Sequence, residues 1–267
     1  MVFRLLESRG YHIIHESVLD QWAKRRYPEI SSVKHLKLLL EEEEVDIRVD
    51  NRFMSIYSQC ERFTMTSIER MYSIYKSIEY LVAADVIGSI VECGVWRGGS
   101  IMQAIYTLLE LGVCDREIYL YDTFAGLPMP SKHDVDYAGE GALPRWKDNI
   151  GQGHNKWCYA PLEEVRENVL GTGYPENKIH FVKGNVEETL PRVLPGAISL
   201  LRLDTDFYLS TKQELLYLYP LLAQCGVLIV DDYGHWQGQK KAVDEFFMGQ
   251  PILFNRIDHA ARLLIKR

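Results

Sequence analysis

Several features are missing from this sequence, and each absence excludes a class of protein. It has no run of about 18 consecutive apolar residues, so we expect no transmembrane helix and no membrane association. Its first residues lack the apolar segment and the small-residue cleavage site of a signal peptide. Basic residues are not in excess, because 30 Lys and Arg stand against 37 Asp and Glu. The charge therefore gives no reason to expect nucleic-acid binding.

Paired cysteines are missing as well. The five cysteines are scattered singly, with no C-x-x-C pair: Cys60, Cys93, Cys114, Cys158 and Cys225. An odd number at wide spacing indicates reduced thiols rather than disulfides or a zinc site. Together with the missing signal peptide, this pattern predicts a cytoplasmic protein.

Two parts of the chain differ in composition and pattern. Residues 1–60 are rich in charge, include four consecutive glutamates at 41–44 and show only short helical patterns. We expect them to form a helical extension that packs on the main domain or on a neighbouring subunit. The chain as a whole is 47% hydrophobic, which allows one full-sized core over residues 61–267.

Helical and strand patterns alternate along that main domain. After a helix at 67–84, strands are predicted at 90–93, 118–121, 179–182, 200–204 and 227–231, and helices at 101–111, 162–170, 211–223 and 240–247. Two short segments, 252–254 and 262–265, are so close in sequence that they can pair only as an antiparallel hairpin. Repeated β-α units predict an α/β fold with a parallel sheet and helices on both faces.

The helix expected at 211–223 carries its own start and stop signals. Ser210 with Gln213 three residues later matches a capping box. Gly226 follows shortly after the last apolar turn and is typical of a helix end.

Two of the predicted strands end on aspartates. These residues are Asp204 and Asp206 after one strand, and Asp231 and Asp232 after the other. In an open α/β sheet, ligands bind beyond the carboxyl ends of the strands, so all four carboxylates should meet at one crevice. They cannot converge there without a cation or raised pKa values. The pattern indicates a site for a small, hard metal ion.

A long polar stretch at 127–160 contains glycines and prolines but little periodicity. A loop of that length inside a compact domain is usually a functional lid or is disordered. Because it follows the second strand, it would hang over the carboxyl ends of the sheet. We favour a lid that covers the substrate over plain disorder.

A glycine-rich turn, Val91–Ser100, joins the first strand to the next helix and could cradle a nucleotide-like ligand. Counted from Gly94, however, the second glycine of a G-x-G-x-x-G fingerprint is replaced by Trp96. The bulk of this residue would block close approach of a pyrophosphate, which disfavours NAD and FAD. The chain also has no G-x-x-x-x-G-K-[ST] motif, so a Walker-type site is excluded.

Acidic and aromatic residues around this turn suit a different ligand. Glu92, just before the glycines, suits an amine, and Asp122 at the end of the next strand could accept from both ribose hydroxyls. Phe124 is placed to stack on a base. Together these groups describe S-adenosylmethionine. The alternative, that Glu92 and Asp122 merely cap neighbouring helices, stays open.

Six stretches occur in a characteristic order: V-E-C-G-V-W-R-G-G-S, Y-D-T-F-A-G-L-P, P-L-E-E-V-R-E-N, G-N-V-E-E-T-L-P, L-L-R-L-D-T-D-F-Y-L-S-T and V-D-D-Y-G-H-W. By these stretches, about 63–247 resembles the macrocin-type sugar O-methyltransferases, which methylate sugar hydroxyls on macrolides and on the aminocoumarin sugar. The resemblance implies a class I methyltransferase (Rossmann-like) fold, with a seven-stranded sheet whose last strand is antiparallel. It also implies a homodimer or homotetramer in which the N-terminal segment reaches a neighbour's active site.

The resemblance further implies roles for individual residues. S-adenosylmethionine would be bound by Met65, Glu92, Gly94, Ser100, Asp122, Phe124, Gly184, Asn185 and Asp204. Magnesium would be held by Asp204, Asp231 and Asp232. The general base would be Asp206 or the lid residue His154. The chain departs from the family at 185–186, where Trp-Phe is common and this sequence has Asn-Val.

The expected reaction is Mg²⁺-dependent transfer of a methyl group from S-adenosylmethionine to a hydroxyl, on a sugar of a glycosylated natural product such as an antibiotic. The ion would lower the pKa of the acceptor hydroxyl and fix its geometry, and Asp206 or His154 would take the proton. Two alternatives stay open. One is a catechol- or phenol-type metal-dependent O-methyltransferase, and the other is a non-catalytic module that binds S-adenosylmethionine.

Overall fold

Seven strands form one mixed sheet in the computed structural model, which describes residues 45–267. The strand order is β3-β2-β1-β4-β5-β7-β6. The parallel strands are β1 (Ser89–Cys93), β2 (Ile118–Asp122), β3 (Ile179–Lys183), β4 (Ile198–Leu203) and β5 (Leu222–Val230). The hairpin of β6 (Asn255–Arg256) and β7 (Arg262–Ile265) adds to β5 in antiparallel fashion. This confirms the expected seven-stranded sheet with an antiparallel end.

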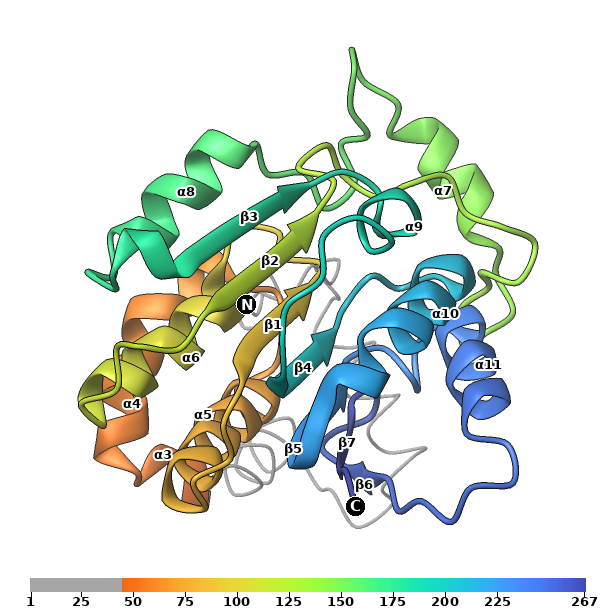
Figure 1. The fold of residues 1–267 in the computed structure, drawn as a ribbon. Coiled ribbons are helices and arrows are strands. Elements are labelled where there is room, and N and C mark those ends of the chain that lie inside the picture. Colours follow the sequence, from red (N-terminus) through yellow and green to blue (C-terminus); the bar gives the residue numbers. More distant parts are fainter. Residues whose placement is uncertain (1–44) are drawn as a thin grey trace, which may run out of the picture.

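Helices cover both faces of the sheet (Figure 1). One face carries α3 (Val45–Arg48), α4 (Asn51–Cys60), α5 (Ile68–Ala83), α6 (Gly99–Glu110) and α8 (Leu162–Leu170), and the other carries α9 (Val186–Thr189), α10 (Tyr208–Tyr217) and α11 (Gln237–Phe246). Because the central strands are covered on both sides, they form continuous buried runs. All six residues of β4 are buried.

The end of the predicted N-terminal extension packs into the main core. Phe53, Ile56 and Cys60 on α4 are buried together with residues of α5, α6 and the sheet. Asp50 caps α4 by accepting a hydrogen bond from the backbone N–H of Phe53 at 3.1 Å. Packing is therefore continuous across residue 60. The predictions for residues 1–44, including the glutamate run, lie outside the described residues.

The structure corrects the expected helix at 211–223. Helix α10 ends at Tyr217, a 3-10 turn follows at Tyr219–Leu221, and β5 already begins at Leu222. Pro220 has no N–H to donate, so it ends the helical hydrogen bonding there. Gly226 consequently lies inside β5 and is not a helix stop.

The capping box expected at the start of that helix is also absent, because α10 begins earlier. Its first N–H, that of Tyr208, donates at 2.7 Å to Oδ1 of Asp134, a buried residue of the 127–160 segment. At the other end of the chain, the short strand expected at 252–254 is displaced to β6.

The segment 127–160 folds over the carboxyl ends of the strands. Figure 1 shows its helix α7 (Ala142–Asp148) on the side to which the arrowheads of β1 to β4 point. Asp134 fixes the base of the segment, because it accepts from α10 and lies close to α11. A Cβ added to Gly238 in α11 would stand only 2.2 Å from Asp134 Oδ1. The segment therefore has the position expected of a lid, and its base is held by two helices.

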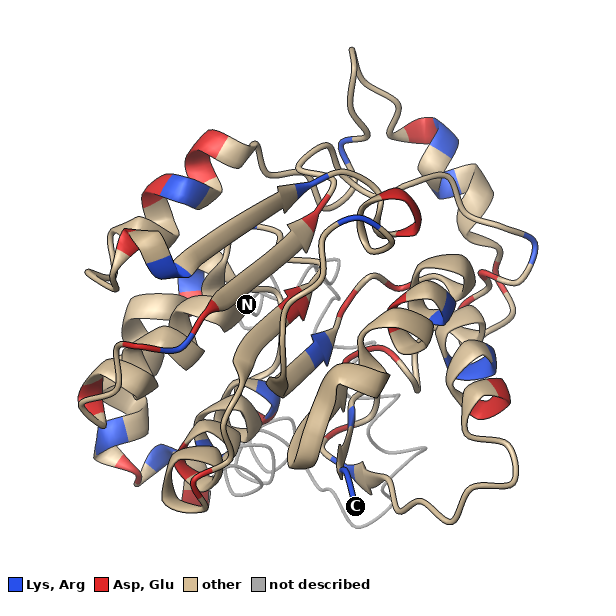
Figure 2. Ribbon diagram, in the orientation of Figure 1, with Lys and Arg blue, Asp and Glu red and all other residues tan. Residues whose placement is uncertain are grey.

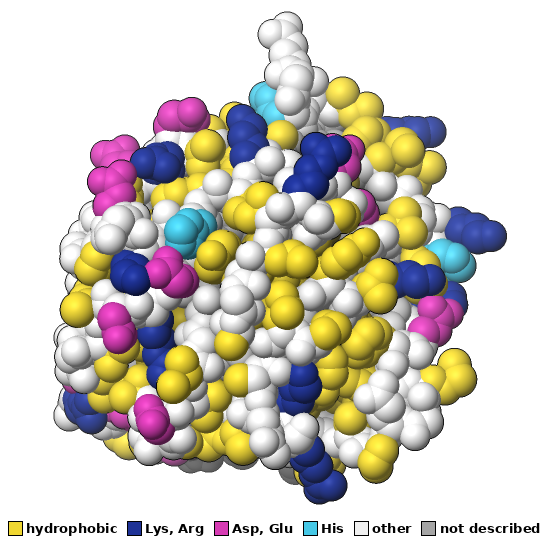
Figure 3. Space-filling view, viewed as in Figure 1, with side chains coloured by type: hydrophobic (Ala, Val, Ile, Leu, Met, Phe, Trp, Pro, Cys, Tyr) yellow, Lys and Arg dark blue, Asp and Glu magenta, His cyan; other side chains and the backbone are white. Residues whose placement is uncertain are grey.

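Within residues 45–267, no helix is long and apolar enough to cross a membrane. On the face seen in Figure 3, acidic and basic side chains are interspersed rather than gathered by sign.

Candidate active site

A cavity of about 240 Å³ lies between the carboxyl ends of the strands and the 127–160 segment. Most of the predicted site residues line it: Met65, Gly94, Ser100, Asp122, Gly184, Asn185, Asp204, Asp206, Asp231 and Asp232. Three predicted residues, Glu92, Phe124 and His154, are not part of its wall. The sequence therefore located the cavity, although not every side chain that faces it.

The glycine turn after β1 is shaped by the neighbouring strand β4. Gly94 has φ +82°, and a Cβ at this position would stand 2.0 Å from the carbonyl oxygen of Asp204. Only glycine combines this conformation with so close an approach. The tips of β1 and β4 therefore touch at the floor of the cavity, which brings the glycine turn and the first aspartate together.

Asp122, at the end of β2, holds this turn. Its Oδ2 accepts from the backbone N–H groups of Val95 at 2.6 Å and Trp96 at 3.2 Å, and its Oδ1 accepts from the N–H of Phe124 at 2.7 Å. The two N–H groups of the turn are thus not free for a phosphate. A carboxylate has about four acceptor positions. The Thr123 hydroxyl lies 3.4 Å from Oδ1 but is much closer, at 2.6 Å, to the carbonyl oxygen of Gly126, to which it donates its one proton. Asp122 can therefore still accept from a ligand in the cavity.

Glu92 lies behind the cavity wall, because an arginine on the adjacent strand binds it. Glu92 and Arg202 are register partners of β1 and β4, and both are almost completely buried. Glu92 Oε1 accepts from the Arg202 guanidinium and from the hydroxyl of Ser100, whereas its Oε2 is buried without a hydrogen-bond partner. In Figure 2, β1 carries red for an acidic residue, β4 carries blue for a basic one, and the rest of both strands is tan. The expected partner, an amine of the ligand, is replaced here by a guanidinium.

Phe124 and His154 also lie elsewhere than the sequence suggested. Phe124 is only 4% exposed and packs in the main core, so the stacking on a base that we expected has no basis in this arrangement. His154 stacks on Tyr159 with a ring-centroid distance of 4.1 Å, away from the cavity wall. The histidine that lines the cavity is His235, which follows the second aspartate pair.

Three of the four aspartates converge. One carboxylate oxygen from each of Asp204, Asp206 and Asp232 lies within 4.8 Å of the others. Asp206 adopts φ +65°, an uncommon conformation for a residue with a side chain, and such outliers concentrate at functional sites. Hard cations such as Mg²⁺ prefer oxygen ligands of this kind.

The electrostatics of this group favour a cation or a proton. Burial, together with the neighbouring carboxylates, raises the pKa of Asp204 well above its usual value even though Arg202 opposes the shift. Burial and the adjacent Asp232 likewise raise the pKa of Asp206 well above its usual value. The site thus has more carboxylate than its own arginines neutralise.

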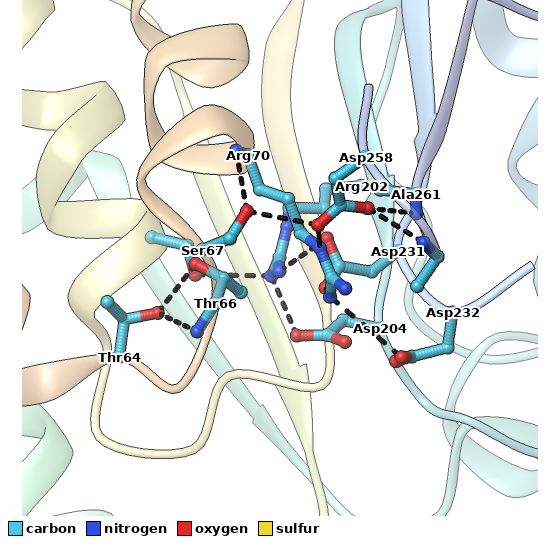
Figure 4. A network of polar contacts seen from close by, with 12 residues as sticks. Thr64, Thr66, Ser67, Arg70, Arg202, Asp204, Asp231, Asp232, Asp258 and Ala261 are labelled. Carbon is cyan, nitrogen blue, oxygen red and sulfur yellow. Dashed lines mark hydrogen bonds and ion pairs between the residues drawn. The ribbon is translucent and has the colours of Figure 1, made fainter. Parts of the chain in front are cut away.

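Asp231 differs from the other three aspartates, because both of its oxygens face arginines (Figure 4). Oδ2 lies 2.6 Å from Nη1 of Arg70, and Oδ1 lies 2.8 Å from Nη2 of Arg202. Burial would raise the pKa of Asp231, but the Arg202 and Arg70 guanidiniums outweigh burial and hold it below its usual value. The expected ligand set of Asp204, Asp231 and Asp232 is therefore not the group that converges here; Asp206 takes the place of Asp231.

The aromatic rings of Trp157 and Trp236 line the cavity. Trp157 from the 127–160 segment, Phe207 and Trp236 pack on one another, with ring centroids 5.6 Å apart for Phe207–Trp236 and 5.9 Å apart for Trp157–Trp236. The guanidinium of Arg145 on α7 lies 4.2 Å from the centroid of the Trp157 ring. The cavity therefore has an acidic floor and an aromatic wall.

Sequence reasoning missed Arg202, Arg70 and His235. Arg202 did carry a signal, since a lone arginine in a buried apolar strand must be paired with acids. Arg70 carried none, because its partners lie 161 and 188 residues away in the chain.

A seven-stranded sheet of this order, with a glycine turn after β1 and a cavity at the carboxyl ends of the strands, defines a class I methyltransferase. The chain belongs to one family within that class, the macrocin O-methyltransferases (TylF), because the sequence model of that family matches residues 14–262.

Three curated relatives are similar to this chain. Demethyldecarbamoylnovobiocin O-methyltransferase of Streptomyces niveus is 33% identical over 183 residues, which is 68% of this chain and 67% of the relative. The 8-demethyl-8-(2,3-dimethoxy-alpha-L-rhamnosyl)-tetracenomycin-C 4'-O-methyltransferase of Streptomyces olivaceus is 33% identical over 64% of this chain and 62% of the relative. Mycinamicin III 3''-O-methyltransferase of Micromonospora griseorubida is 28% identical over 64% and 65%. The chain thus spans about two thirds of the length of these relatives.

Two solved structures share the fold. The O-methyltransferase NovP superposes with a TM-score of 0.66 at 28% identity, covering 76% of this chain and 82% of that chain. The calicheamicin methyltransferase CalS11 superposes with a TM-score of 0.55 at 19% identity, covering 98% and 97%.

Proposed function

We propose that this methyltransferase transfers a methyl group from S-adenosylmethionine to a hydroxyl of a sugar on a glycosylated natural product, with a magnesium ion in the site. The observation that carries this proposal is the convergence of Asp204, Asp206 and Asp232 in the same cavity as the glycine turn. The named activities of the three curated relatives support the choice of acceptor.

S-adenosylmethionine fits the residues on the β1–β2 side of the cavity. Met65, Gly94, Asp122 and Gly184 line this side, and Asp122 retains acceptor capacity for ribose hydroxyls. The cofactor supplies the methyl group from a positively charged sulfonium. A cavity with surplus carboxylate is suited to receive that charge.

A magnesium ion fits the residues on the β4–β5 side. Asp204 and Asp232 would hold it, since magnesium usually takes one or two protein carboxylates and fills its other positions with water and substrate. When bound, such an ion lowers the pKa of a hydroxyl and fixes its orientation. Arg202 holds Asp204 from behind at 2.9 Å, and Gln239 accepts from the backbone N–H of Asp232 at 2.8 Å.

Asp206 is the residue to which we assign the proton of the acceptor hydroxyl. It lies in the cavity wall beside the two proposed ligands, and its raised pKa brings it nearer the operating pH of a general base. The Trp157 and Trp236 rings line the same cavity. Their flat apolar faces suit the face of a sugar ring.

The test of this proposal is methyl transfer from labelled S-adenosylmethionine to a panel of glycosylated acceptors, with magnesium or with EDTA. We expect transfer that EDTA abolishes, and a loss of about 10²–10³-fold in kcat for Asp204→Asn. Binding of S-adenosylhomocysteine to this variant, measured by calorimetry, should stay near that of the wild type. Full activity of Asp204→Asn in EDTA would contradict the role of the ion, and transfer only to catechols would contradict the sugar acceptor.

Asp206→Asn separates the proton acceptor from an ion ligand. If Asp206 accepts the proton, this variant loses kcat and the pH dependence of kcat, and its magnesium affinity falls only about tenfold, which is the effect of losing one nearby charge. A variant whose magnesium affinity falls as far as that of Asp204→Asn would place Asp206 among the ligands instead. Asparagine tolerates the left-handed backbone of position 206, so the fold should be unaffected.

A further inference from the structure

Arg70 joins parts of the chain that lie far apart in sequence (Figure 4). It is buried on α5, and its Nη1 lies 2.6 Å from Asp231 Oδ2 at the end of β5. Its Nε donates at 2.7 Å to Oδ2 of Asp258, in the turn between β6 and β7. The same Oδ2 accepts from the hydroxyl of Ser67, which caps α5. The C-terminal hairpin, the start of α5 and the β5 aspartates therefore form one polar unit.

The two arginines of this network differ in what surrounds them. Arg202 is 2% exposed and is enclosed by three carboxylates between β1, β4 and β5. Arg70 instead lines the cavity, and its Nη1 is 3.9 Å from Asp232 Oδ1, an oxygen of the converging aspartates. Arg70 is thus the arginine that faces the space where a divalent ion would be held.

A divalent ion and the Arg70 guanidinium are attracted by the same carboxylates and repel each other. At a separation of about 6 Å, one positive charge changes the affinity for a divalent ion about tenfold even at the dielectric constant of water. Asp231 also stays anchored by Arg202 when Arg70 is removed, and the backbone of Asp232 stays bound to Gln239. The loss of repulsion should therefore outweigh the loss of positioning.

We propose that Arg70 is a positioning residue that acts as an internal counter-ion: it holds Asp231 and Asp232 in place without a divalent ion and competes with that ion for Asp232. The inference rests on the proposed function, which includes the ion. Asp258 gives Arg70 a second carboxylate, so the guanidinium keeps one partner when an ion weakens its contacts to β5. The affinity for the ion is then set by residues of α5 and of the C-terminal hairpin, as well as by the ligands.

The experiment is a titration of the full-length protein with MgCl₂ by calorimetry, together with melting curves with and without the ion. Arg70→Met should bind magnesium about tenfold more tightly than the wild type. It should also melt lower without the ion and gain more in Tm when the ion is added. Arg70→Lys keeps the charge and should stay within about threefold of the wild-type affinity.

Arg262→Met is the matched control. This arginine lies on β7, and its Nη1 donates to the carbonyl oxygens of Asp258, Ala260 and Ala261 rather than to a carboxylate of the site. The substitution removes a charge of the same sign from the hairpin that Arg70 contacts, and we expect wild-type magnesium affinity. An increase equal to that of Arg70→Met would overturn the inference, as would unchanged or weaker binding in Arg70→Met.

Asp258→Asn tests the same idea without removing the arginine. With its second carboxylate neutralised, Arg70 should act on Asp231 and Asp232 alone, and magnesium affinity should fall several-fold. Unchanged affinity in this variant would also overturn the inference. Methyl transfer is measured separately. If the wild type transfers methyl groups but Arg70→Met leaves the magnesium affinity unchanged, this inference alone is refuted. The expected ion effects in a protein that transfers no methyl group refute the proposed function alone.

Discussion

The two sides of the cavity differ in how their carboxylates are neutralised. On the β1–β2 side, the carboxylate that lines the cavity is held by the chain itself, since Asp122 accepts from three backbone N–H groups and fixes the glycine turn. On the β4–β5 side, carboxylates crowd together beyond what Arg70 and Arg202 neutralise. The β1–β2 side is therefore preformed, because its turn is held by hydrogen bonds within the chain before any ligand binds. On the β4–β5 side, the carboxylates repel one another, and a bound cation would reduce that repulsion. The difference indicates that the β1–β2 side supports the cofactor and the β4–β5 side supports a cation.

The largest expected effect comes from removing Arg202, the buried arginine among the carboxylates of the β4–β5 side. Arg202→Met leaves Glu92, Asp204 and Asp231 without their common partner, and we expect the free energy of unfolding to fall by about 3–5 kcal/mol. Urea denaturation at pH 7 measures it. Arg116→Met is the control, because Arg116 donates to carbonyl oxygens and a hydroxyl rather than to acids, and should cost about 1–2 kcal/mol. Equal losses would mean that the carboxylates are not crowded.

On the β1–β2 side, Asp122→Asn tests whether the carboxylate is needed to hold the glycine turn. An amide offers one acceptor oxygen instead of two and places its NH₂ against backbone donors. We therefore expect a loss of about 1–3 kcal/mol in the free energy of unfolding, with weaker binding of S-adenosylhomocysteine. Denaturation and calorimetry check the two effects. A variant with unchanged stability and unchanged binding would show that the turn does not depend on this residue.

An effect that is small per pH unit, but spread over several units, concerns Glu214 of α10. It is completely buried, accepts from the hydroxyl of Thr205 between the β4 aspartates at 2.8 Å, and burial raises its pKa to about 8. The folded protein therefore holds a proton that the unfolded chain releases above pH 4.5 or so. Its stabilising contribution is full below that pH and is lost as pH rises toward 8.

Glu214→Gln should remove this dependence. Between pH 5 and 8, the wild-type free energy of unfolding should fall relative to that of the variant by about 1.4 kcal/mol per pH unit. Urea denaturation at four pH values within that range measures the difference. Parallel curves for the two proteins would show that Glu214 does not titrate as its burial indicates.

Most of the fold was predictable because its strands are buried on both faces. The apolar runs of β1, β2, β3 and β4 were found to within a residue or two, and their parallel order brought the aspartates to one edge. The border between α10 and β5 was not found. Leu222 and Ala223 continue the helical pattern of the preceding turns, but the strand already begins at Leu222, which pairs with Ile198 of β4.

The position of the site in the fold could be predicted from the sequence, but the contacts between its side chains could not. Asp204 and Asp232 follow from strand ends, which local sequence marks. The engagement of Asp231 by Arg70, and the burial of Phe124, depend on packing between distant segments that no local pattern encodes. His154 was proposed as a base because the resemblance implies a base from a lid histidine, but in this fold it stacks on Tyr159 outside the cavity wall.

The attachment of the 127–160 segment has a consequence for how this protein can change. Its base is fixed, since Asp134 caps α10 and Val135 accepts from the backbone N–H of Gln237 in α11. Its outer part, by contrast, exposes Tyr137 and Ile150 to solvent. Neither side chain lines the cavity, so this outer part can change in sequence, in evolution or in the laboratory, while the aspartates and the glycine turn beneath it keep their contacts.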